Sequence, residues 1–217
     1  MTKRFKTIIT IAVLFVFSVS ASFIYGTFKP NTWTLQEYKT DIETKHALWA
    51  KDLGLHAPTM SYKTNLQFVS ELKKCVDFLN FQTPPNLRVP IDMLVAQAVL
   101  ESGWGTSRFA DEANNLFGIR TWDKDKGVLP IGMSEKTPWR VRSFETKCDS
   151  VAHYIRMINE VFAYQELREV RARIINDGGF PTGLDLAPTL TKYASRANYT
   201  ELVATLIKYN IRGVYDL

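Results

Sequence analysis

The residue best suited to acid–base chemistry is Glu101, at the end of an apolar helical pattern. Glu101 follows Leu94 by seven positions and Gln97 by four, so its side chain projects along the edge of the apolar face, and Gly103 and Gly105 then end the helix. The negative end of the helix dipole and partial burial both disfavour an ionised carboxylate. The pattern is typical of a glutamate held protonated as a general acid, and equally of an exposed glutamate at a helix end.

Cysteine and histidine are the other residue types that could do chemistry. The two cysteines, Cys75 and Cys148, are either a disulfide in an oxidising compartment or two separate small apolar residues. The three histidines, His46, His56 and His153, have no metal-like spacing with the cysteines or with one another. We therefore expect no metal site and no cofactor, and no cysteine or zinc chemistry of the kind that cleaves amides.

Helices must position Glu101, because apolar residues recur at helical spacing along most of the chain. A polar helix is expected over residues 31–53, followed by a break at residues 54–61 that includes Pro58. Further helices are expected over residues 66–79 after a Thr64 cap, from Pro90 to Glu101, and over residues 146–162, 165–176 and 184–194. Asn198, with Glu201 three residues later, predicts a capped final helix.

Only residues 127–144 depart from the helical pattern. Pro130, Gly132 and Pro138 interrupt this stretch, and residues 139–142 alternate between apolar and basic side chains. We interpret it as a β-hairpin inserted in a helical domain, which makes the fold mainly α with a small α+β lobe.

Charge is concentrated at the N-terminus. The chain has 27 basic and 22 acidic residues, but Lys3, Arg4, Lys6 and Lys29 stand in a segment without acids, and the remainder has 23 basic residues against the same 22 acids. An apolar run over residues 8–28 follows the first three basic residues and has the length of a membrane span. The near-neutral remainder and this segment argue against nucleic acid as a partner.

The N-terminal segment predicts export, with the rest of the chain beyond the cytoplasmic membrane. It is either an uncleaved signal anchor, which the prolonged apolar run favours, or a signal peptide with small residues near Ala21 for cleavage. A buried core helix is the remaining alternative. We expect three parts: a signal anchor or signal peptide (1–29), a membrane-proximal helical stalk or linker (30–61) and a compact domain (62–217).

Several motifs in order resemble one known family. They are Glu-Ser-Gly-Trp-Gly-Thr-Ser-Arg-Phe-Ala at 101–110, Asn-Asn-Leu-Phe-Gly-Ile at 114–119, Trp-Asp at 122–123, Gly-Val-Leu-Pro at 127–130, Val-Arg-Ser-Phe at 141–144, Tyr-Gln-Glu-Leu-Arg at 164–168, Lys-Tyr-Ala-Ser at 192–195 and Asn-Tyr at 198–199. From about residue 66 onward the chain resembles the glucosaminidase domain of bacterial peptidoglycan hydrolases, glycoside hydrolase family 73, and most of all its Bax-type members.

This resemblance implies a lysozyme-like helical lobe, a small β-hairpin lobe and a cleft between them. It also implies hydrolysis of the β-1,4 bond that follows N-acetylglucosamine in the glycan strand. Glu101 matches the family's proton donor, and Tyr193 matches a tyrosine that lines the cleft, with core packing as its alternative role. Glu135, near the hairpin tip, is either the second carboxylate or a solvated turn residue, and Asp123 and Asp125 lie close to it in the sequence.

Aromatic and amide side chains are the remaining candidates for glycan binding: Trp104, Asn115, Phe117, Trp122, Trp139 and Tyr199. Trp104 and Phe117 are better explained as packing residues around Glu101, whereas Trp122 and Trp139 on the hairpin favour sugar contact. Asn115 is better explained as a turn cap than as an acetamido ligand.

The sequence thus predicts an exported peptidoglycan hydrolase of the cell envelope. Its domain would be anchored in the membrane and face the periplasm or cell exterior, or be secreted if the signal is cleaved, and its partners would be glycan strands and the membrane. The alternative is a non-catalytic wall-binding or envelope-assembly protein that retains the cleft.

Overall fold

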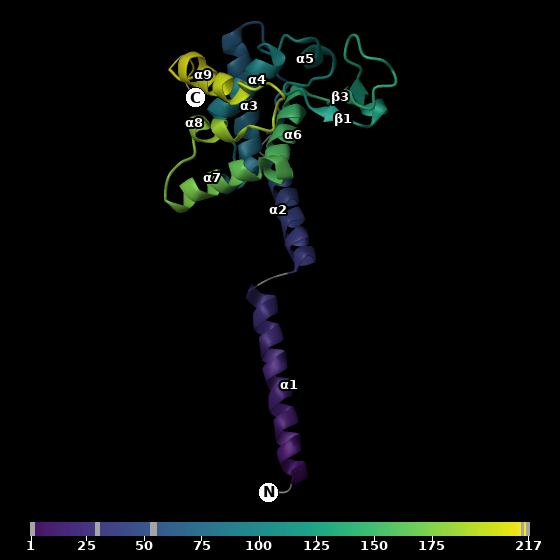
Figure 1. Cartoon of the computed structure of the whole chain (residues 1–217), viewed down its shortest axis with the longest axis vertical. Helices are drawn as coiled ribbons and strands as arrows, with labels where there is room; N and C mark the ends of the chain where they lie inside the picture. The colour runs from purple at the N-terminus through teal and green to yellow at the C-terminus, as the bar shows by residue number, and fades with distance from the viewer. Residues whose placement is uncertain (1–2, 29–30, 53–55, 214, 216–217) are drawn as a thin grey trace. The chain divides into compact units, whose positions relative to one another are not determined.

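A computed structural model describes residues 3–28, 31–52, 56–213 and 215 (Figure 1). The chain divides into two units, Met1–Gly54 and Leu55–Leu217. Lys29, which bounds the predicted membrane segment, and Gly54, in the predicted break, lie outside the described residues.

The first unit contains two helices, α1 (Lys3–Phe28) and α2 (Thr32–Asp52). Within α1, Lys3–Gly26 has a mean hydropathy of 2.4 and none of its side chains is buried, so this helix is long and apolar enough to cross a membrane. A signal sequence near an N-terminus has the same properties. Asn31 begins α2, because its side chain accepts a hydrogen bond of 2.7 Å from the backbone amide of Thr34.

Two helices form the centre of the second unit. Thr64 caps α3 (Asn65–Gln82) in a capping box with Gln67, and Thr83 ends it before a short 3-10 turn, Pro85–Leu87. The helix α4 (Ile91–Ser102) is buried on almost every side, which its near-continuous apolar sequence explains. The short α5 (Arg108–Glu112) follows α4 and is capped by Ser107.

Two further helices pack beside this centre. Thr146 begins α6 (Lys147–Glu160) with a capping box to Asp149, and a 3-10 turn at Phe162–Tyr164 leads into α7 (Gln165–Asn176). Buried apolar side chains of α3, α4, α6 and α7 meet in one core, which includes Phe68, Leu94, Ile158 and Leu167. The helices predicted here all form.

The predicted hairpin is a three-stranded antiparallel sheet, to one side of the helices in Figure 1. The strand β3 (Arg140–Arg142) is central, between β1 (Arg120–Thr121) and β2 (Gly127–Val128), with Val141 opposite both Arg120 and Val128. A 3-10 turn, Lys124–Lys126, joins β1 to β2. The sequence analysis missed β1, because two residues are too few to give an alternating pattern.

The single helix predicted over residues 184–194 is wrong. Instead α8 (Gly183–Leu186) ends at a 3-10 turn, Ala187–Thr189. Pro188 lacks the amide hydrogen that would bond the carbonyl four residues earlier in a continuing helix, so α8 gives way to the 3-10 turn. The segment after Leu190 is therefore a series of turns, and these turns carry Tyr193.

The last helix, α9 (Tyr199–Leu206), forms and continues as a π-helical turn, Ile207–Ile211. The predicted side-chain cap does not form, because Asn198 has φ −98° and ψ 22°, which is not the extended conformation of a capping residue. Arg212, beyond the π-helical turn, pairs with the buried Asp92 at the start of α4 at 2.7 Å. The other carboxylate oxygen of Asp92 accepts a hydrogen bond from the Gly183 amide.

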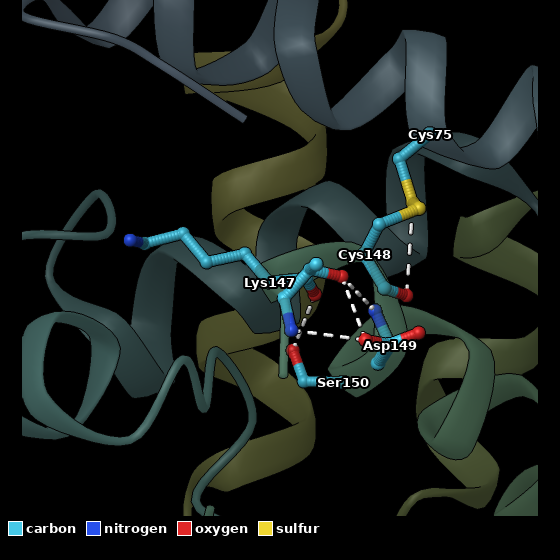
Figure 2. The surroundings of a disulfide bond; sticks show 6 residues. Cys75, Lys147, Cys148, Asp149 and Ser150 are labelled. Carbon is cyan, nitrogen blue, oxygen red and sulfur yellow. Dashed lines mark hydrogen bonds between the residues drawn. A yellow bond between two sulfur atoms is a disulfide. The ribbon is translucent and has the colours of Figure 1, made fainter. Parts of the chain in front are cut away.

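Cys75 and Cys148 form a disulfide between α3 and α6, with their Cα atoms 5.7 Å apart (Figure 2). The sequence alone had left this pairing open. Both residues are buried, and the bond joins positions 73 residues apart beside the start of α6.

Candidate active site

Glu101 lies in the last turn of α4, where several contacts fix the backbone. Gly103 ends the helix in the left-handed conformation with φ 57°. The Ser102 hydroxyl donates to the carbonyl of Ala98 and accepts a 2.8 Å hydrogen bond from the amide of Gly105. A Cβ atom on Gly105 would lie 2.2 Å from the Tyr62 hydroxyl, so only glycine fits there. The glycine-rich segment therefore fixes the end of α4 that carries Glu101.

The half-buried Glu101 faces a cavity of about 790 Å³ between the helices and the sheet. Residues from four regions line the cavity: the turn and strand β1 at 117–122, α6, the 3-10 turn after α6, and the turns at 191–195. Among the lining residues that the structure describes, Glu101 is the sole carboxylate, and Arg120 and Lys192 are the cations. A cavity with one carboxylate beside apolar and hydroxyl-bearing walls suits a neutral polar ligand better than a cation.

Burial raises the pKa of Glu101 above the ordinary range of a glutamate, and a hydrogen bond from Tyr199 partly opposes this rise. Desolvation penalises the ionised carboxylate, whereas a hydroxyl donor stabilises it. The net increase in pKa keeps Glu101 protonated at a higher pH than a free glutamate. The carboxyl group can therefore donate a proton to a ligand in the cavity.

Gly118 approaches Glu101 closely from the opposite wall. It has φ +64°, and a Cβ atom there would lie 3.4 Å from Oε2 of Glu101. The neighbouring Asn115 is buried and holds this turn: its side-chain oxygen accepts from the amides of Phe117 and Ile119, and its Nδ2 donates to the carbonyl of Arg142 at 2.8 Å. The turn thus places the backbone of Gly118, which has no side chain, next to the carboxyl group of Glu101.

Tyr193 lines the cavity, and its hydroxyl donates a 3.0 Å hydrogen bond to the carbonyl of Phe117. Its ring stacks on Tyr199, with centroids 5.3 Å apart and an interplanar angle of 11°. The ring of Phe117 stacks in turn on Tyr154 at 4.3 Å. The structure thus gathers Tyr193, Phe117 and Tyr199 around Glu101, although Tyr199 itself lies behind the cavity wall.

Trp122 extends the cavity onto the sheet, since it lines the cavity and is 73% exposed. Trp139 is half-buried, and its ring is covered by the guanidinium of Arg120 at 4.1 Å. Trp104 lies behind the end of α4 and packs against Phe68 with centroids 6.5 Å apart. Of the three tryptophans named from the sequence, Trp122 is therefore the one that presents an open face to the cavity.

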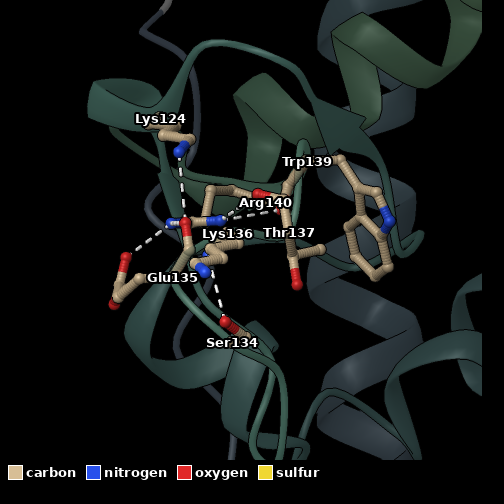
Figure 3. Close-up of polar contacts among 7 residues, drawn as sticks. All are labelled: Lys124, Ser134, Glu135, Lys136, Thr137, Trp139 and Arg140. Carbon is tan, nitrogen blue, oxygen red and sulfur yellow. Dashed lines mark hydrogen bonds and ion pairs between the residues drawn. The ribbon is translucent and has the colours of Figure 1, made fainter.

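Glu135 lies in the loop before β3 (Figure 3). It is not among the residues that line the cavity. Its carboxylate pairs with Arg140 at 2.7 Å, and its side chain is 83% exposed whereas that of Arg140 is 5% exposed. The Arg140 guanidinium also donates to the carbonyls of Thr137 and Trp139, and Lys124 donates to the carbonyl of Glu135. These bonds hold the loop around Arg140.

The sequence analysis did not select several residues near Glu101. Gln97 served only to place Glu101 on its helix and Tyr154 was not singled out, yet both are buried and share a hydrogen bond. Tyr164 and Arg120 line the cavity as well; Tyr164 belonged to the motif at 164–168, and Arg120 lies between the motifs at 114–119 and 122–123. Nothing local distinguishes such residues, because their partners lie far away in the sequence. Among the described residues, no group of three or more metal-ligating side chains gathers.

Comparison with known proteins agrees with this geometry. Residues 83–212 match the glucosaminidase family model, described as mannosyl-glycoprotein endo-beta-N-acetylglucosaminidase. The chain is 33% identical over 89 residues to protein bax of Escherichia coli strain K12, covering 40% of this chain and 30% of that protein. It is 32% identical over 96 residues to the peptidoglycan hydrolase FlgJ of Vibrio parahaemolyticus serotype O3:K6, covering 39% of this chain and 31% of that protein.

The matched segment is thus about a third of the length of these relatives, and no solved structure matches the chain. The family match spans α4, the sheet and the turns that carry Tyr193, which are the parts that build the cavity. The mainly α fold with a small antiparallel sheet is that of a lysozyme-like domain. Since the family model covers more than half of the chain, this protein belongs to the glucosaminidase family.

Proposed function

We propose that this protein is an exported peptidoglycan hydrolase that cleaves the β-1,4 glycosidic bond after N-acetylglucosamine, with Glu101 as the general acid. The observation that carries the proposal is the half-buried carboxyl group of Glu101, with a raised pKa, in the cavity of a glucosaminidase-family domain. The Vibrio relative is a peptidoglycan hydrolase, which supports glycan of the cell wall as the substrate.

In this proposal, protonated Glu101 donates its proton to the glycosidic oxygen as the bond breaks. Departure of the sugar hydroxyl is otherwise slow, and a positioned acid contributes roughly 10²–10⁴-fold to such a step. Trp122 offers its exposed face to an adjacent sugar ring, and Tyr193 supports the cavity floor through its bond to Phe117. The cavity volume of about 790 Å³ lies within the usual range of ligand-binding sites.

The positive charge that develops on the sugar requires a second group. Three solutions exist in glycosidases: a base that activates water, a carboxylate nucleophile, or the substrate's own acetamido group. Glu135 remains the proposed second carboxylate, and to act it must leave Arg140 and turn toward the cavity. The Glu135 side chain is exposed and free to turn, but its departure leaves the buried guanidinium of Arg140 without a carboxylate, so this movement costs more than the separation of an exposed ion pair.

Export is supported by two independent features. The helix α1 follows basic residues and has the length and hydropathy of a membrane span, which favours a cytoplasmic N-terminus. The Cys75–Cys148 disulfide suits an oxidising compartment, since cytosolic thiols are kept reduced.

The experiment is digestion of purified sacculi by the full chain in detergent. New reducing ends are identified by mass spectrometry after borohydride reduction, which marks the sugar at each cleaved bond. We expect reduced N-acetylglucosamine ends from the wild type and none above background from Glu101→Gln. Equal release by both proteins would contradict the role of Glu101, and reduced N-acetylmuramic acid ends would contradict the assigned bond.

A non-catalytic glycan-binding protein is the alternative. The observation in its favour is Glu135, whose carboxylate is engaged by Arg140 outside the cavity lining. Under this alternative the protein sediments with sacculi and releases no fragments, and Glu101→Gln binds as the wild type does.

A further inference from the structure

A chain of buried hydrogen bonds leads to Glu101 from behind the cavity. The hydroxyl of Tyr154, on α6, donates to Oε1 of Gln97 on α4. The Nε2 of Gln97 donates at 3.0 Å to the hydroxyl oxygen of Tyr199 on α9. Glu101 follows Gln97 by one helical turn on α4, so the Tyr199 hydroxyl lies on the side of Glu101, and an interaction with this hydroxyl lowers the pKa of the Glu101 carboxyl group. The chain thus joins three helices, and its first three members are buried.

The number of donors determines which group donates in each hydrogen bond from Tyr154 through Gln97 to Tyr199. A tyrosine hydroxyl has one proton, and an amide has a separate donor and acceptor end. Because the Tyr154 proton goes to Oε1, the amide of Gln97 must present its NH₂ group to Tyr199. Because the Tyr199 oxygen accepts from that NH₂ group, the proton of Tyr199 remains available for Glu101. If the Gln97 amide were reversed, its oxygen would compete with Glu101 for that proton.

We propose that Tyr154 is a positioning residue that acts through Gln97 and Tyr199: it holds the Gln97 amide in the orientation that leaves the hydroxyl proton of Tyr199 directed toward Glu101. This proposal rests on the proposed function for its catalytic meaning, but its physical content concerns the ionisation of Glu101 and can be tested without turnover. Hydrogen bonds to the ionised form lower a carboxyl pKa, so the chain limits the rise that burial causes.

Other titratable and charged groups face Glu101 and must be distinguished from the chain. They come from every neighbouring element: Tyr154 and His153 on α6, Tyr164 on the following 3-10 turn, Lys192 and Tyr193 on the turns, Tyr199 on α9 and Arg120 on β1. Burial lowers the pKa of His153 to about 4, so this residue is neutral near pH 7 and does not hold Glu101 ionised. The phenols are neutral at that pH as well, because burial raises the pKa of each one.

The test is a direct titration of Glu101 in the full chain in detergent, by ¹³C NMR of labelled glutamate carboxyl carbons, with Glu101→Gln identifying the signal. Tyr199→Phe removes the donor, so the pKa of Glu101 should rise by about one pH unit or more. Tyr154→Phe leaves the hydroxyl of Tyr199 in place but frees the Gln97 amide to reverse. The pKa should therefore rise in this variant too, by no more than in Tyr199→Phe, and the double variant should add nothing.

Gln97→Met gives the sharpest contrast. Methionine has nearly the same shape and offers Tyr199 no competing carbonyl acceptor, so the Tyr199 proton still turns to Glu101 and the pKa stays near the wild-type value. The substitution of the more distant residue, Tyr154→Phe, should thus have the larger effect. In the Gln97→Met background, Tyr154→Phe should have no effect. Tyr164→Phe is the matched control, because it removes a neighbouring buried hydroxyl outside the chain and should leave the pKa unchanged.

Three results would each overturn the proposal. The first is a near-wild-type pKa of Glu101 in Tyr154→Phe, and the second is an additive rise of this pKa in the double variant. The third is a larger rise in Gln97→Met than in Tyr154→Phe. Circular dichroism checks that the variants fold. If Tyr154→Phe does not fold, the test is the pKa of Glu101 in the other two variants, which should rise in Tyr199→Phe and stay near the wild-type value in Gln97→Met. Failure of the proposed function gives a different result: the titrations behave as expected, yet Glu101→Gln digests sacculi as the wild type does. The alkaline limb of the pH–rate profile should move with the titrated pKa in each active variant.

Discussion

The protonation of Glu101 gives the first prediction at the residue scale. Burial raises its pKa, so the acid form persists to a higher pH than in a free glutamate. Only the protonated form can donate to the glycosidic oxygen. We therefore expect kcat/KM for glycan cleavage to fall about tenfold per pH unit on the alkaline side of this pKa.

The measurement is the rate of reducing-end release from sacculi between acidic and alkaline pH, with circular dichroism at each pH to show that the protein stays folded. A rate that is flat, or that increases through this range, would be inconsistent with Glu101 as the acid.

The close approach of Gly118 to Glu101 gives a second prediction. In Gly118→Ala the new methyl group meets Oε2 at 3.4 Å, and alanine in this left-handed conformation costs about 1–2 kcal/mol. We expect lower stability by that amount and a loss of activity of about tenfold or more, because small displacements of a catalytic group are costly.

Gly178→Ala is the matched control, because Gly178 has φ +80° and nothing within 4 Å of its Cβ position. It should lose similar stability and keep its activity. Equal activities of the two variants in sacculus digestion, compared at equal folded fraction, would show that Gly118 does not constrain Glu101.

Sequence reasoning found the residues whose chemistry is local. Glu101 was identified from its place at a glycine-ended helix, and Trp122 and Tyr193 from their motifs; all three line one cavity. Gln97 and Tyr154 were not selected, because a buried polar residue on an apolar face looks like any core position. Gln97 lies 57 residues before Tyr154 and 102 residues before Tyr199, and only the fold reveals these two pairings.

Among the elements, the sheet carries the open face of Trp122. In Trp122→Ala we expect KM for glycan to rise about tenfold with little change in kcat, since burial of one such face against a sugar contributes about 1.5 kcal/mol. Steady-state rates on soluble glycan fragments measure both constants. Phe180→Ala is the control, because Phe180 is 91% exposed and does not line the cavity. A fall in kcat at constant KM would contradict a binding role for Trp122.

The disulfide between α3 and α6 leads to a prediction about stability. A bond that closes a loop of 73 residues restricts the unfolded chain, so Cys75→Ala/Cys148→Ala should lower the free energy of unfolding by about 2–4 kcal/mol. Urea unfolding with and without reductant measures this. Reductant should destabilise the wild type and leave the double variant unchanged; a wild type insensitive to reductant would contradict a structural role for the bond.

Most elements were predictable because their signals are local. Thr64 and Thr146 start α3 and α6 where capping residues were expected, and the sheet lies where the helical pattern stops. The failures have local causes too: Pro188 broke one predicted helix, and the Asn198 backbone did not adopt the capping conformation. The pairing of β1 with β3 depends on contacts twenty residues apart, which no pattern in β1 itself reveals.

For the whole molecule, the prediction concerns α1. Its length exceeds a signal-peptide core, so we expect an uncleaved anchor: the native protein remains in the membrane pellet after carbonate extraction, and its mass corresponds to a chain that still contains α1. Alkaline phosphatase fused after the chain should be active, because it folds only beyond the cytoplasmic membrane. A soluble native protein whose N-terminus lies near Ala21 would show a cleaved signal peptide instead.

The pair between Asp92 and Arg212 also constrains the order of events during synthesis. These residues lie 120 positions apart, and Asp92 is almost fully buried at the start of the helix that carries Glu101. Until Arg212 has emerged from the ribosome, the nascent chain cannot neutralise that carboxylate, and burying it unpaired is strongly unfavourable. We therefore expect the start of α4 to become buried only once residue 212 can pair with it, so that the polypeptide before residue 212 stays unfolded while it is exported.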